Sequence, residues 1–327
     1  MGSRRRALVT GAGGFVGANL VRRLAAEGFS VTAAIRPGGD AWRLDGAPVD
    51  VAELDLADPV AVDALIRILR PSFVFHLAAH GAYPHQARVH QIVRTNVVGT
   101  VNLLEACLDA GFEAFVNTGS SSEYGFKDHA PTEDEALEPN SDYAWTKAAA
   151  THFCRHRAAA TGLRIPTLRL YSVYGPYEQP GRLIPALVVH GMAGRLPPLV
   201  DPGISRDFVY IDDVCDAYLL AATRSLPEPG AVFNVGTGTQ ISLGEAVEVA
   251  RRRFGIAQSP EWGTMPNRSW DTSVWVSQPA RIGRELGWQP KHGFQRGFDR
   301  CVEWFEAHPD LALRYGAPAV EGTSPIG

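Results

Sequence analysis

A glycine-rich turn directly after the first apolar segment constrains the fold of this chain more than any other feature. Residues 7–9 read Ala-Leu-Val, and the segment 10–17 that follows reads Thr-Gly-Ala-Gly-Gly-Phe-Val-Gly and leads into a helix-like stretch. Gly11 permits a tight turn, Gly14 lets the backbone approach a pyrophosphate, and Gly17 lets the helix pack closely on the strand. Because a strand precedes the motif and a helix follows it, we predict a dinucleotide-binding βαβ unit.

The first half of the chain alternates short apolar segments with helical ones. This alternation is typical of βαβ units around a parallel sheet. We therefore predict an α/β fold, a doubly wound Rossmann sheet. Its expected strands are 6–10, 30–35, 49–54, 73–77, 114–118 and 165–171, and its expected helices are 15–27, 59–69, 90–110 and 142–161.

Beyond residue 174 frequent prolines interrupt the chain, and regular alternation does not return. An apolar strand at 231–235, followed by a capping box at Ser242 and Glu245 that opens a helix, indicates that the chain revisits the sheet. We predict a Rossmann domain over 1–173 with a return at about 206–240. A smaller, interleaved cap would comprise 174–205 and 241–327.

The composition of the chain argues against nucleic acids and membranes as binding partners. The 327 residues carry a net charge of −4, which argues against a nucleic-acid surface. No run of 18 apolar residues appears, so we expect no membrane partner. The basic residues 4–6 lead into a strand rather than into a signal-peptide core, so we expect a cytoplasmic protein.

Neither the cysteines nor the histidines predict a metal site. The four cysteines are widely spaced, without a C-x-x-C pair, and we interpret them as packing residues. His152 and His156 lie four residues apart, which is a metal-ligand spacing. No Glu follows His152, however, and no third ligand is evident. We expect no metal.

Tyr143 and Lys147 are a candidate proton-transfer pair. Only three of the 31 basic residues are lysines, and Lys147 follows Tyr143 by four residues, a spacing that places both on one face of a helix. A nearby ammonium stabilises a phenolate and lowers the pKa of a tyrosine. The pair predicts a phenol that can donate and accept a proton.

The end of the second predicted strand bears on cofactor choice. A carboxylate there would bind the adenosine ribose of NAD, whereas an arginine accommodates the 2′-phosphate of NADP. The strand 31–35 is followed by Arg36, with Arg43 close by and no acid at the strand end. We favour NADP(H), with NAD(H) as the alternative; Arg36 could also simply stack on adenine.

Five motifs follow one another along the chain: Thr10-Gly-x-x-Gly-x-x-Gly17, Asp55-Leu56, His76-Leu77-Ala78-Ala79, Asn96 and Tyr143-x-x-x-Lys147. Together they resemble the extended short-chain dehydrogenase/reductase superfamily, the NAD(P)-dependent epimerase/dehydratase family. The resemblance spans nearly the whole chain and implies a Rossmann fold with a cap that binds a nucleotide sugar. It implies that Lys147 binds the nicotinamide ribose and that Asn96 sits behind Lys147. The other residues that it implies for the cofactor are Gly11, Gly14, Phe15, Val16 and Gly17 at the phosphates, Asp55 and Leu56 at adenine, and Leu77, Ala78 and Ala79 along the cofactor.

In this family the catalytic hydroxyl follows the fifth strand, and counting back from Tyr124-Gly125 assigns it to Ser120. Ser121 and Ser122 fall where the family's sugar-nucleotide 4,6-dehydratases carry Asp and Glu. Without those carboxylates, elimination of water lacks its general acid and base. Glu123 lies one position away from the site of those carboxylates and is a weak substitute for them. We therefore disfavour dehydration.

The resemblance also implies a nucleotide-diphosphate sugar as substrate. Arg206 and Arg268 resemble the family's diphosphate clamps, and a guanidinium presents a fork of donors to phosphate oxygens. Either arginine could instead form an ordinary surface ion pair. Further candidate substrate contacts are His80, Tyr83, Ser121, Ser122, Ser172 and Tyr174.

The sequence leaves the reaction open. We favour an NADPH-dependent 4-ketoreductase, with Tyr143 protonating the forming alkoxide and Ser120 holding the carbonyl oxygen. A weaker likeness to CDP-paratose and CDP-abequose synthases over 80–98 and 170–213 agrees with it. The alternative is an NAD-dependent 4-epimerase of the UDP-glucose or UDP-glucuronate type. A non-catalytic NADP-binding sensor is only a minor alternative. Such proteins usually lose the tyrosine or the lysine, and this chain keeps both Tyr143 and Lys147.

The resemblance implies a homodimer as well. Family members commonly pair two helices of each subunit in a four-helix interface. The corresponding helices here are those expected near 90–110 and 142–161.

Overall fold

The computed structural model describes residues 5–82, 86–267 and 271–316, which are built around a seven-stranded parallel sheet. The strand order is β10-β6-β5-β4-β1-β2-β3. This is a Rossmann-type α/β fold, so the predicted fold class is confirmed. The strands are β1 (Arg6–Thr10), β2 (Ser30–Ile35), β3 (Asp50–Glu53), β4 (Phe73–His76), β5 (Ala114–Ser120), β6 (Thr167–Leu170) and β10 (Val232–Val235).

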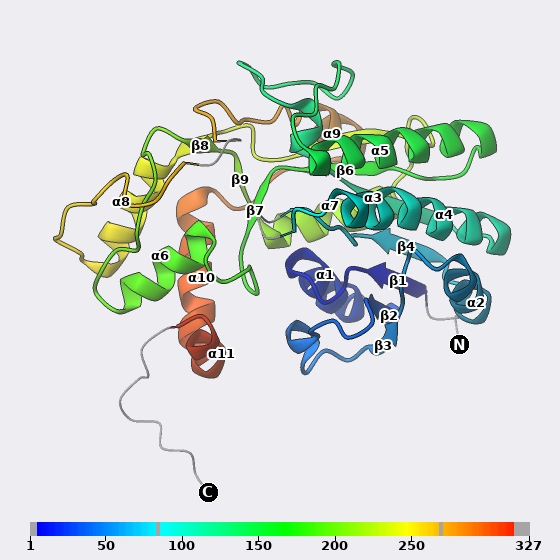
Figure 1. Ribbon diagram of the computed structural model, residues 1–327, viewed down its shortest axis with the longest axis horizontal. Coiled ribbons are helices and arrows are strands. Elements are labelled where there is room, and N and C mark those ends of the chain that lie inside the picture. Colours follow the sequence, from blue (N-terminus) through cyan, green and yellow to red (C-terminus); the bar gives the residue numbers. More distant parts are fainter. Residues whose placement is uncertain (1–4, 83–85, 268–270, 317–327) are drawn as a thin grey trace, which may run out of the picture.

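Helices cover both faces of this sheet (Figure 1). One apolar cluster joins one face to α2 (Pro59–Leu69), α4 (Gly99–Ala110) and α5 (Asp142–Thr161). The other face packs against α1 (Phe15–Ala26) and α7 (Ile211–Thr223). Burial on both sides explains why the central strands read as nearly continuous apolar runs.

The helix predicted over 90–110 is not one regular α-helix. It comprises α3 (Val89–Val93), a π-helical turn η2 (Arg94–Val98), and α4. Asn96 lies within the π turn, and its carbonyl accepts a hydrogen bond from Thr100 Oγ1 at 2.7 Å. Wider turns of this kind frequently occur at functional sites.

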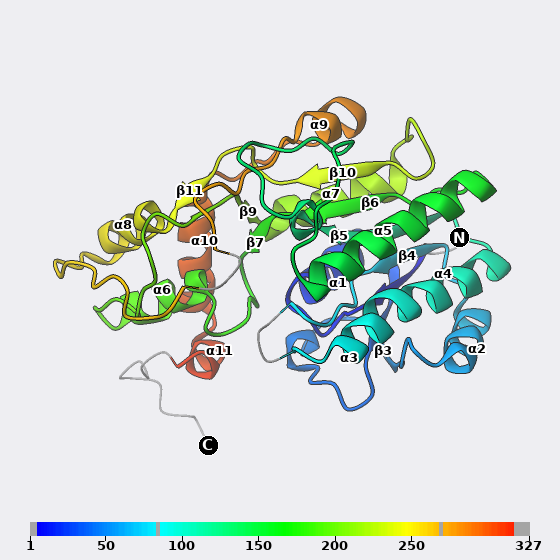
Figure 2. The same ribbon diagram turned by 45° about the horizontal axis from the view of Figure 1, so that its top comes forward.

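The remaining elements form a second, smaller body beside the sheet (Figures 1 and 2). β7 (Ser172–Tyr174) pairs in parallel with β9 (Phe208–Tyr210), and β8 (Ser205–Arg206) pairs antiparallel with β11 (Ile241–Ser242). We call these strands and their helices the cap. The helices are α6 (Leu183–Met192), α8 (Leu243–Phe254), α10 (Phe294–Ala307) and α11 (Pro309–Arg314).

The chain passes between sheet and cap more than once. It leaves the sheet after β6, returns through α7 and β10, re-enters the cap, and passes α9 (Ala280–Leu286) before ending in α10 and α11. One apolar core joins α1 and α7 to α6, α8 and α10. The capping box at Ser242 and Glu245 opens α8. Division of the chain at 173 stays a prediction.

Two structural findings concern membrane spans and metal sites. No helix within the described ranges is long and apolar enough to cross a membrane. Over the same ranges, no group of three or more His, Cys, Asp or Glu side chains is arranged to hold a metal ion. His152 and His156 are exposed on α5, and all four cysteines are buried.

Candidate active site

The glycines of the first turn are required by sterics. Gly11 adopts φ +68°, and a Cβ there would lie 2.6 Å from the Ala78 nitrogen. A Cβ on Gly17 would lie 2.3 Å from the Gly11 carbonyl oxygen, and one on Gly14 would lie 3.1 Å from the same atom. The turn after β1, the start of α1 and the loop after β4 can approach this closely only without side chains.

The start of α1 suits a phosphate. Its N-cap is Gly14, which has extended backbone and no capping side chain, and its first turn contains no acidic residue. Phe15 and Val16 open the helix and pack against the core. The first backbone N–H groups of such a helix favour an anion, so this chain's residues fit the pyrophosphate of a dinucleotide.

The predicted adenosine contacts lie at the carboxyl ends of β2 and β3. Arg36 is exposed directly after β2. After β3, the Asp55 side chain is 50% exposed and pairs with Arg94 at 3.2 Å, and Leu56 is buried. Arg43, close to Arg36 in the sequence, is buried and donates to the Tyr177 carbonyl at 2.7 Å.

The loop after β4 is fastened to the π turn. Asn96 is 1% exposed, and its side chain accepts from the His80 N–H at 2.8 Å and donates to the His80 carbonyl at 2.9 Å. It also donates to Thr146 Oγ1 at 2.9 Å, and Thr146 is the neighbour of Lys147 on α5. Asn96 thereby ties α5 to the loop that carries three predicted cofactor contacts, Leu77, Ala78 and Ala79.

The proposed catalytic side chains come from β5 and α5. Ser120 ends β5 and is 8% exposed. Tyr143 is half-buried in the first turn of α5, and Lys147 lies one turn later at 2% exposure. Glu123 connects the two elements, since its Oε1 accepts from the Ser120 N–H at 2.8 Å and from Thr151 Oγ1 at 3.1 Å.

Electrostatics at this point are dominated by burial. Burial lowers the pKa of the Lys147 ammonium, whereas the Glu123 carboxylate raises it. His76 lies nearby, between Thr10 Oγ1 at 2.7 Å and Thr100 Oγ1 at 2.8 Å. Burial, with Lys147 close, lowers the pKa of His76 to about 3, so the imidazole is neutral at neutral pH.

On the cap side, the predicted contacts lie in different surroundings, and one of them is corrected. Ser172 is half-buried at the start of β7. Tyr174 was predicted to contact substrate, but it is 0% exposed and its hydroxyl donates to the Phe294 carbonyl at 3.2 Å. Its ring packs among aromatic neighbours, so Tyr174 is a core residue. Tyr83 and Arg268 lie outside the described residues.

Arg206 is held on the cap by several contacts. Its guanidinium pairs with Asp271 and donates to the Ser205 carbonyl at 2.7 Å, and it lies 5.8 Å from the centre of the Trp275 ring. Ser121 and Trp275 both line a small cavity of about 10 Å³. The cavity thus joins the turn after β5 to the loop that carries Trp275.

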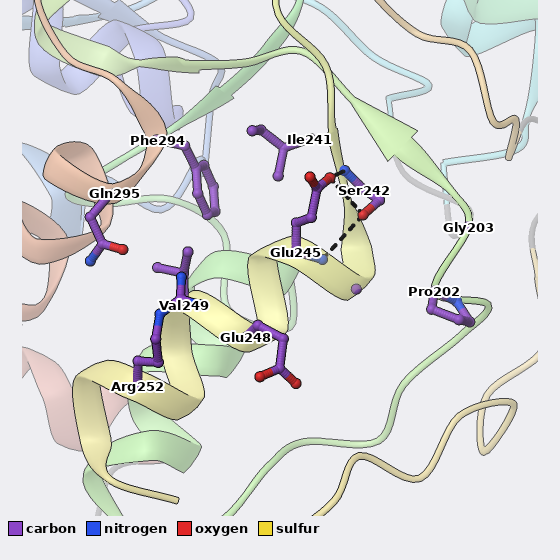
Figure 3. Close-up of a pocket in the computed structure, with 11 residues that line it drawn as sticks. Pro202, Gly203, Ile241, Ser242, Glu245, Glu248, Val249, Arg252, Phe294 and Gln295 are labelled. Carbon is purple, nitrogen blue, oxygen red and sulfur yellow. Dashed lines mark hydrogen bonds between the residues drawn. The ribbon is translucent and has the colours of Figure 1, made fainter.

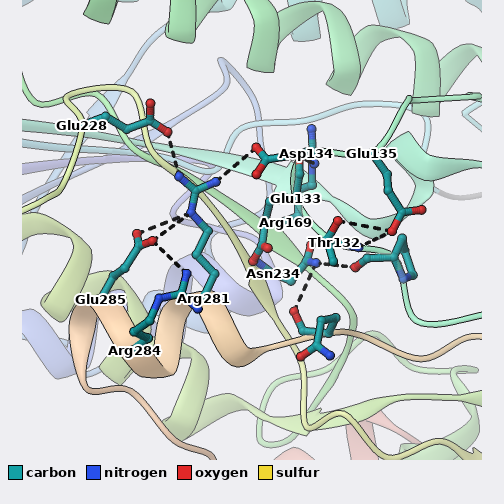
Figure 4. A network of polar contacts seen from close by, with 12 residues as sticks. Thr132, Glu133, Asp134, Glu135, Arg169, Glu228, Asn234, Arg281, Arg284 and Glu285 are labelled. Atoms are coloured by element: carbon teal, nitrogen blue, oxygen red, sulfur yellow. Dashed lines mark hydrogen bonds and ion pairs between the residues drawn. The ribbon is translucent and has the colours of Figure 1, made fainter.

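The structural roles of two buried acids were not predicted from the sequence. Asp207 is 0% exposed and accepts hydrogen bonds from Thr237, Gly238 and Ser277, and so fixes two loops beside Arg206. Glu123 pairs with Arg169 at 2.9 Å, and Figure 4 shows Arg169 within a larger polar network. The spacing of Ser120 and Glu123 is that of a capping box, which could have revealed the role of Glu123.

A larger hollow of about 980 Å³ opens on the cap between α8 and α10 (Figure 3). Neither Ser120, Tyr143 nor Lys147 lines it. Its Ser242 and Glu245 bond to each other as the cap of α8. Ser242 and Glu245 therefore cap α8, and the hollow contains none of the candidate catalytic residues. We place the candidate chemistry at the edge of the sheet, beside Ser120, Tyr143 and Lys147.

Comparisons with known proteins identify the family of this chain. The model of the NAD dependent epimerase/dehydratase family matches residues 7–236. The UDP-glucose 4-epimerase of Mycolicibacterium smegmatis is 34% identical over 311 residues, covering 92% of this chain and 98% of the relative. The dTDP-glucose 4,6-dehydratase of Streptomyces griseus is 30% identical over 315 residues, with coverage of 92% and 94%.

A solved structure shows the same arrangement. The UDP-glucose 4-epimerase of Thermus thermophilus, in complex with NAD, superposes with a TM-score of 0.82 at 31% identity. The match covers 92% of this chain and 99% of that chain, so it includes most of the cap.

Proposed function

This chain belongs to the NAD dependent epimerase/dehydratase family, and from that premise we propose that it is an NAD-dependent 4-epimerase of nucleotide-diphosphate sugars. Membership confirms the resemblance found in the sequence and the prediction of an enzyme. Its relatives include a UDP-glucose 4-epimerase and a dTDP-glucose 4,6-dehydratase. The choice between these reactions therefore rests on the residues around Ser120.

The environment of Glu123 is the observation that carries the proposal. Ser121 and Ser122 supply no carboxylate for elimination of water. Glu123, the nearest acid in the sequence, is 0% exposed, with both oxygens engaged by Ser120, Thr151 and Arg169. An acid closed off in this way cannot reach a substrate, so the site retains proton transfer by Tyr143 without the groups for dehydration.

The roles that we assign to the chain's own residues follow from their positions. Tyr143 would take the proton of the C4 hydroxyl and return it, while Ser120 holds that oxygen. Lys147 would bind the nicotinamide ribose and stabilise the Tyr143 phenolate. NAD, when bound, would supply the group that accepts the hydride from C4 and gives it back. The cradle that holds it would comprise Gly11, Gly14 and Gly17, with Asp55, Leu56, Ala78 and Ala79 alongside.

NAD is the cofactor of the proposed reaction. The Thermus epimerase structure contains NAD. In this chain the buried guanidinium of Arg43 binds Tyr177 and Gln179, which leaves Arg36 as the exposed arginine of the two. Glu53, at the end of β3, accepts a hydrogen bond from the Gly38 N–H at 3.4 Å, so an acid lies beside the turn that carries Arg36.

A 4-ketoreductase using NADPH is the second candidate, and one observation favours it. Arg36 is exposed at the end of β2, where an arginine accommodates a 2′-phosphate. Preference for NADP therefore stays a prediction, as does the likeness to CDP-paratose and CDP-abequose synthases. A cytoplasmic location also stays a prediction.

One experiment separates the two reactions. The purified protein is incubated with UDP-glucose or UDP-glucuronate and NAD, and the anomeric signals are followed by proton NMR. An epimerase interconverts the C4 epimers without net consumption of cofactor. Stoichiometric loss of NADPH absorbance with a nucleotide 4-keto sugar, and no epimerisation, would replace the first proposal by the second.

We further propose a homodimer through α4 and α5. Trp145 on α5 is 51% exposed and Val98, which ends the π turn directly before α4, is 42% exposed, so α5 and the start of α4 are each flanked by an exposed apolar side chain. Trp145→Arg should convert the dimer to a monomer in light scattering coupled to size exclusion. An exposed arginine substitution elsewhere, Val60→Arg on α2, is the control. A wild-type monomer would contradict the proposal.

A further inference from the structure

Glu123 lies between the two elements that carry the proposed chemistry. Its backbone belongs to the turn η3 (Ser121–Tyr124) directly after β5, and its carboxylate reaches α5. Oε1 accepts from the Ser120 N–H at 2.8 Å and from Thr151 Oγ1 at 3.1 Å. Thr151 follows Lys147 by one helical turn, so the carboxylate lies against the helix face that carries Lys147.

The carboxylate belongs to a buried row of alternating charge. Lys147, Glu123, Arg169 and Glu133 are each 5% exposed or less. Arg169 donates to Glu123 Oε2 at 2.9 Å and to the Glu133 carbonyl at 3.2 Å. Figure 4 shows how Arg169, Glu133 and Asn234 continue toward Arg281. Burial of a charge is costly unless an opposite charge is close, so each member depends on its neighbours.

Lys147 has few groups that can balance its charge. Glu123 faces it from η3, His76 from β4 and Cys154 from α5 itself. Burial lowers the pKa of His76 to about 3 and raises the pKa of the Cys154 thiol to about 12, so both are neutral at neutral pH. Tyr143 lies one turn before Lys147. Glu123 is therefore the acid among these neighbours.

Substitution at Gly119 illustrates how tightly this acid is seated. A Cβ on Gly119 would lie 2.6 Å from Glu123 Oε1 and 2.9 Å from Thr167 Cγ2. The carboxylate fills the space beside the end of β5 and has no route to a substrate. Its effect on chemistry must pass through Ser120 and Lys147.

We propose that Glu123 is a positioning residue, which fixes Ser120 through its backbone N–H and supplies the counter-charge that keeps the buried Lys147 ammonium charged. The role of these two residues in turnover rests on the proposed function. The charge of Lys147, however, is a property of the folded chain and can be measured without substrate.

The scarcity of lysine makes this measurement direct. The chain has lysines only at 127, 147 and 291, so ε-¹³C-lysine labelling of the full chain gives three side-chain signals, and Lys147→Arg assigns one of them. In Glu123→Gln the Lys147 signal should titrate at a pH lower by about one unit, the scale of an opposite charge nearby. The Lys127 and Lys291 signals should not move.

Glu133→Gln is the matched control, because it removes the next buried carboxylate of the row, which accepts from the Asn234 N–H and does not bond to Ser120 or Thr151. Lys147 should titrate in it as in the wild type. If Glu123→Gln does not fold because Arg169 loses its partner, the double variant Glu123→Gln with Arg169→Gln removes both charges and is read in the same way.

Turnover supplies the second readout. If Lys147 must be charged, activity is lost as pH rises through its pKa, so the alkaline limb of the kcat profile should move to lower pH in Glu123→Gln. An unchanged Lys147 titration in Glu123→Gln would overturn the inference, even in an active epimerase. A shifted titration in a protein without epimerase activity would uphold it while the proposed function failed.

Discussion

The sheet and the cap of this molecule hold their candidate functional groups in different ways. On the sheet, the candidate cofactor site consists of backbone turns at strand ends, where Gly11, Gly17 and Ala78 approach one another closely. On the cap, side chains bridge segments far apart in the sequence, as Arg206 does to Asp271 across 65 residues. A backbone site depends on a local pattern of small residues, whereas a bridged site depends on the tertiary fold.

Tyr143→Phe should produce the largest effect and would localise the chemistry to the sheet side. Loss of the phenolic proton should lower kcat by about 10²- to 10⁴-fold, the range for general acid–base groups. Affinity for NAD should remain close to that of the wild type. The matched control is Tyr315→Phe, which removes a hydroxyl bonded to the Glu178 carbonyl at the cap junction.

Steady-state kinetics and titration of NAD by fluorescence test both variants. A Tyr143→Phe enzyme that turns over like the wild type would contradict our assignment and would revive the hypothesis of a non-catalytic NADP-binding sensor. A Tyr315→Phe enzyme with an equal loss of kcat would break the contrast between sheet and cap.

Gly17→Ala tests the backbone site itself. The added Cβ would lie 2.3 Å from the Gly11 carbonyl oxygen, which is backbone and cannot rotate away. We expect a loss of at least about tenfold in NAD affinity and about 1–3 kcal/mol of stability, as for overpacked sites. Gly293→Ala is the control on the cap, where a Cβ meets no atom within 4 Å. NAD affinity, measured by calorimetry, and the free energy of unfolding, measured by chemical denaturation, should change by less in Gly293→Ala than in Gly17→Ala.

Asp207→Asn tests the bridged site. The Asp207 carboxylate accepts from two N–H groups of the 237–238 turn and from Ser277, which lies 70 residues away. An amide offers one acceptor oxygen, so the two loops should loosen around Arg206. We expect a roughly tenfold higher KM for the nucleotide sugar, about the value of one charged hydrogen bond, with NAD affinity unchanged.

Asp212→Asn is the control, since its side chain is 47% exposed and lies 3.7 Å from Arg300. An equal loss of NAD and sugar affinity in Asp207→Asn would mean that Asp207 maintains the whole fold rather than the cap site.

The same contrast explains which features could be predicted from the sequence and which could not. The strands, the glycine turn and the box at Ser242 and Glu245 are local patterns, and each lies where we predicted it. Tyr174 was misjudged because its burial depends on Phe294, which is 120 residues away. The burial of Arg43 could not be predicted for a similar reason, since its partner Tyr177 lies across the junction of sheet and cap.

Glu123 shows a third case. From the sequence we considered it only as an acid one place away from the position of a dehydratase carboxylate, whereas its spacing from Ser120 is that of a capping box. Only the position of Arg169, 46 residues away on β6, decides between these interpretations. Local signals therefore predicted where the turn lies, and the sheet order determined what the carboxylate does there.

Glu178→Gln should produce the smallest effect, a pH-dependent change in stability that separates the two regions. Glu178 is buried in the loop after β7; its Oε1 lies 3.7 Å from Arg182 Nε, and its Oε2 has no hydrogen-bond partner among the described residues. Burial raises the pKa of its carboxyl to about 8, so the folded protein keeps a proton that the unfolded chain releases above its ordinary value of 4.5. Stability from this group is thus lost as pH rises from about 4.5 to about 8.

His76 on the sheet has the opposite sign. Its pKa of about 3 lies below the ordinary 6.5, so the unfolded chain binds a proton first, and stability is lost as pH falls from 6.5 toward 3.

Glu178→Gln cannot ionise, so its Tm relative to the wild type should be higher at pH 8 than at pH 5 by a few degrees. Exposed Glu113→Gln should show no such difference. Equal Tm offsets of Glu178→Gln at both pH values would mean that Glu178 is ionised in the folded protein, with Arg182 as its counter-charge.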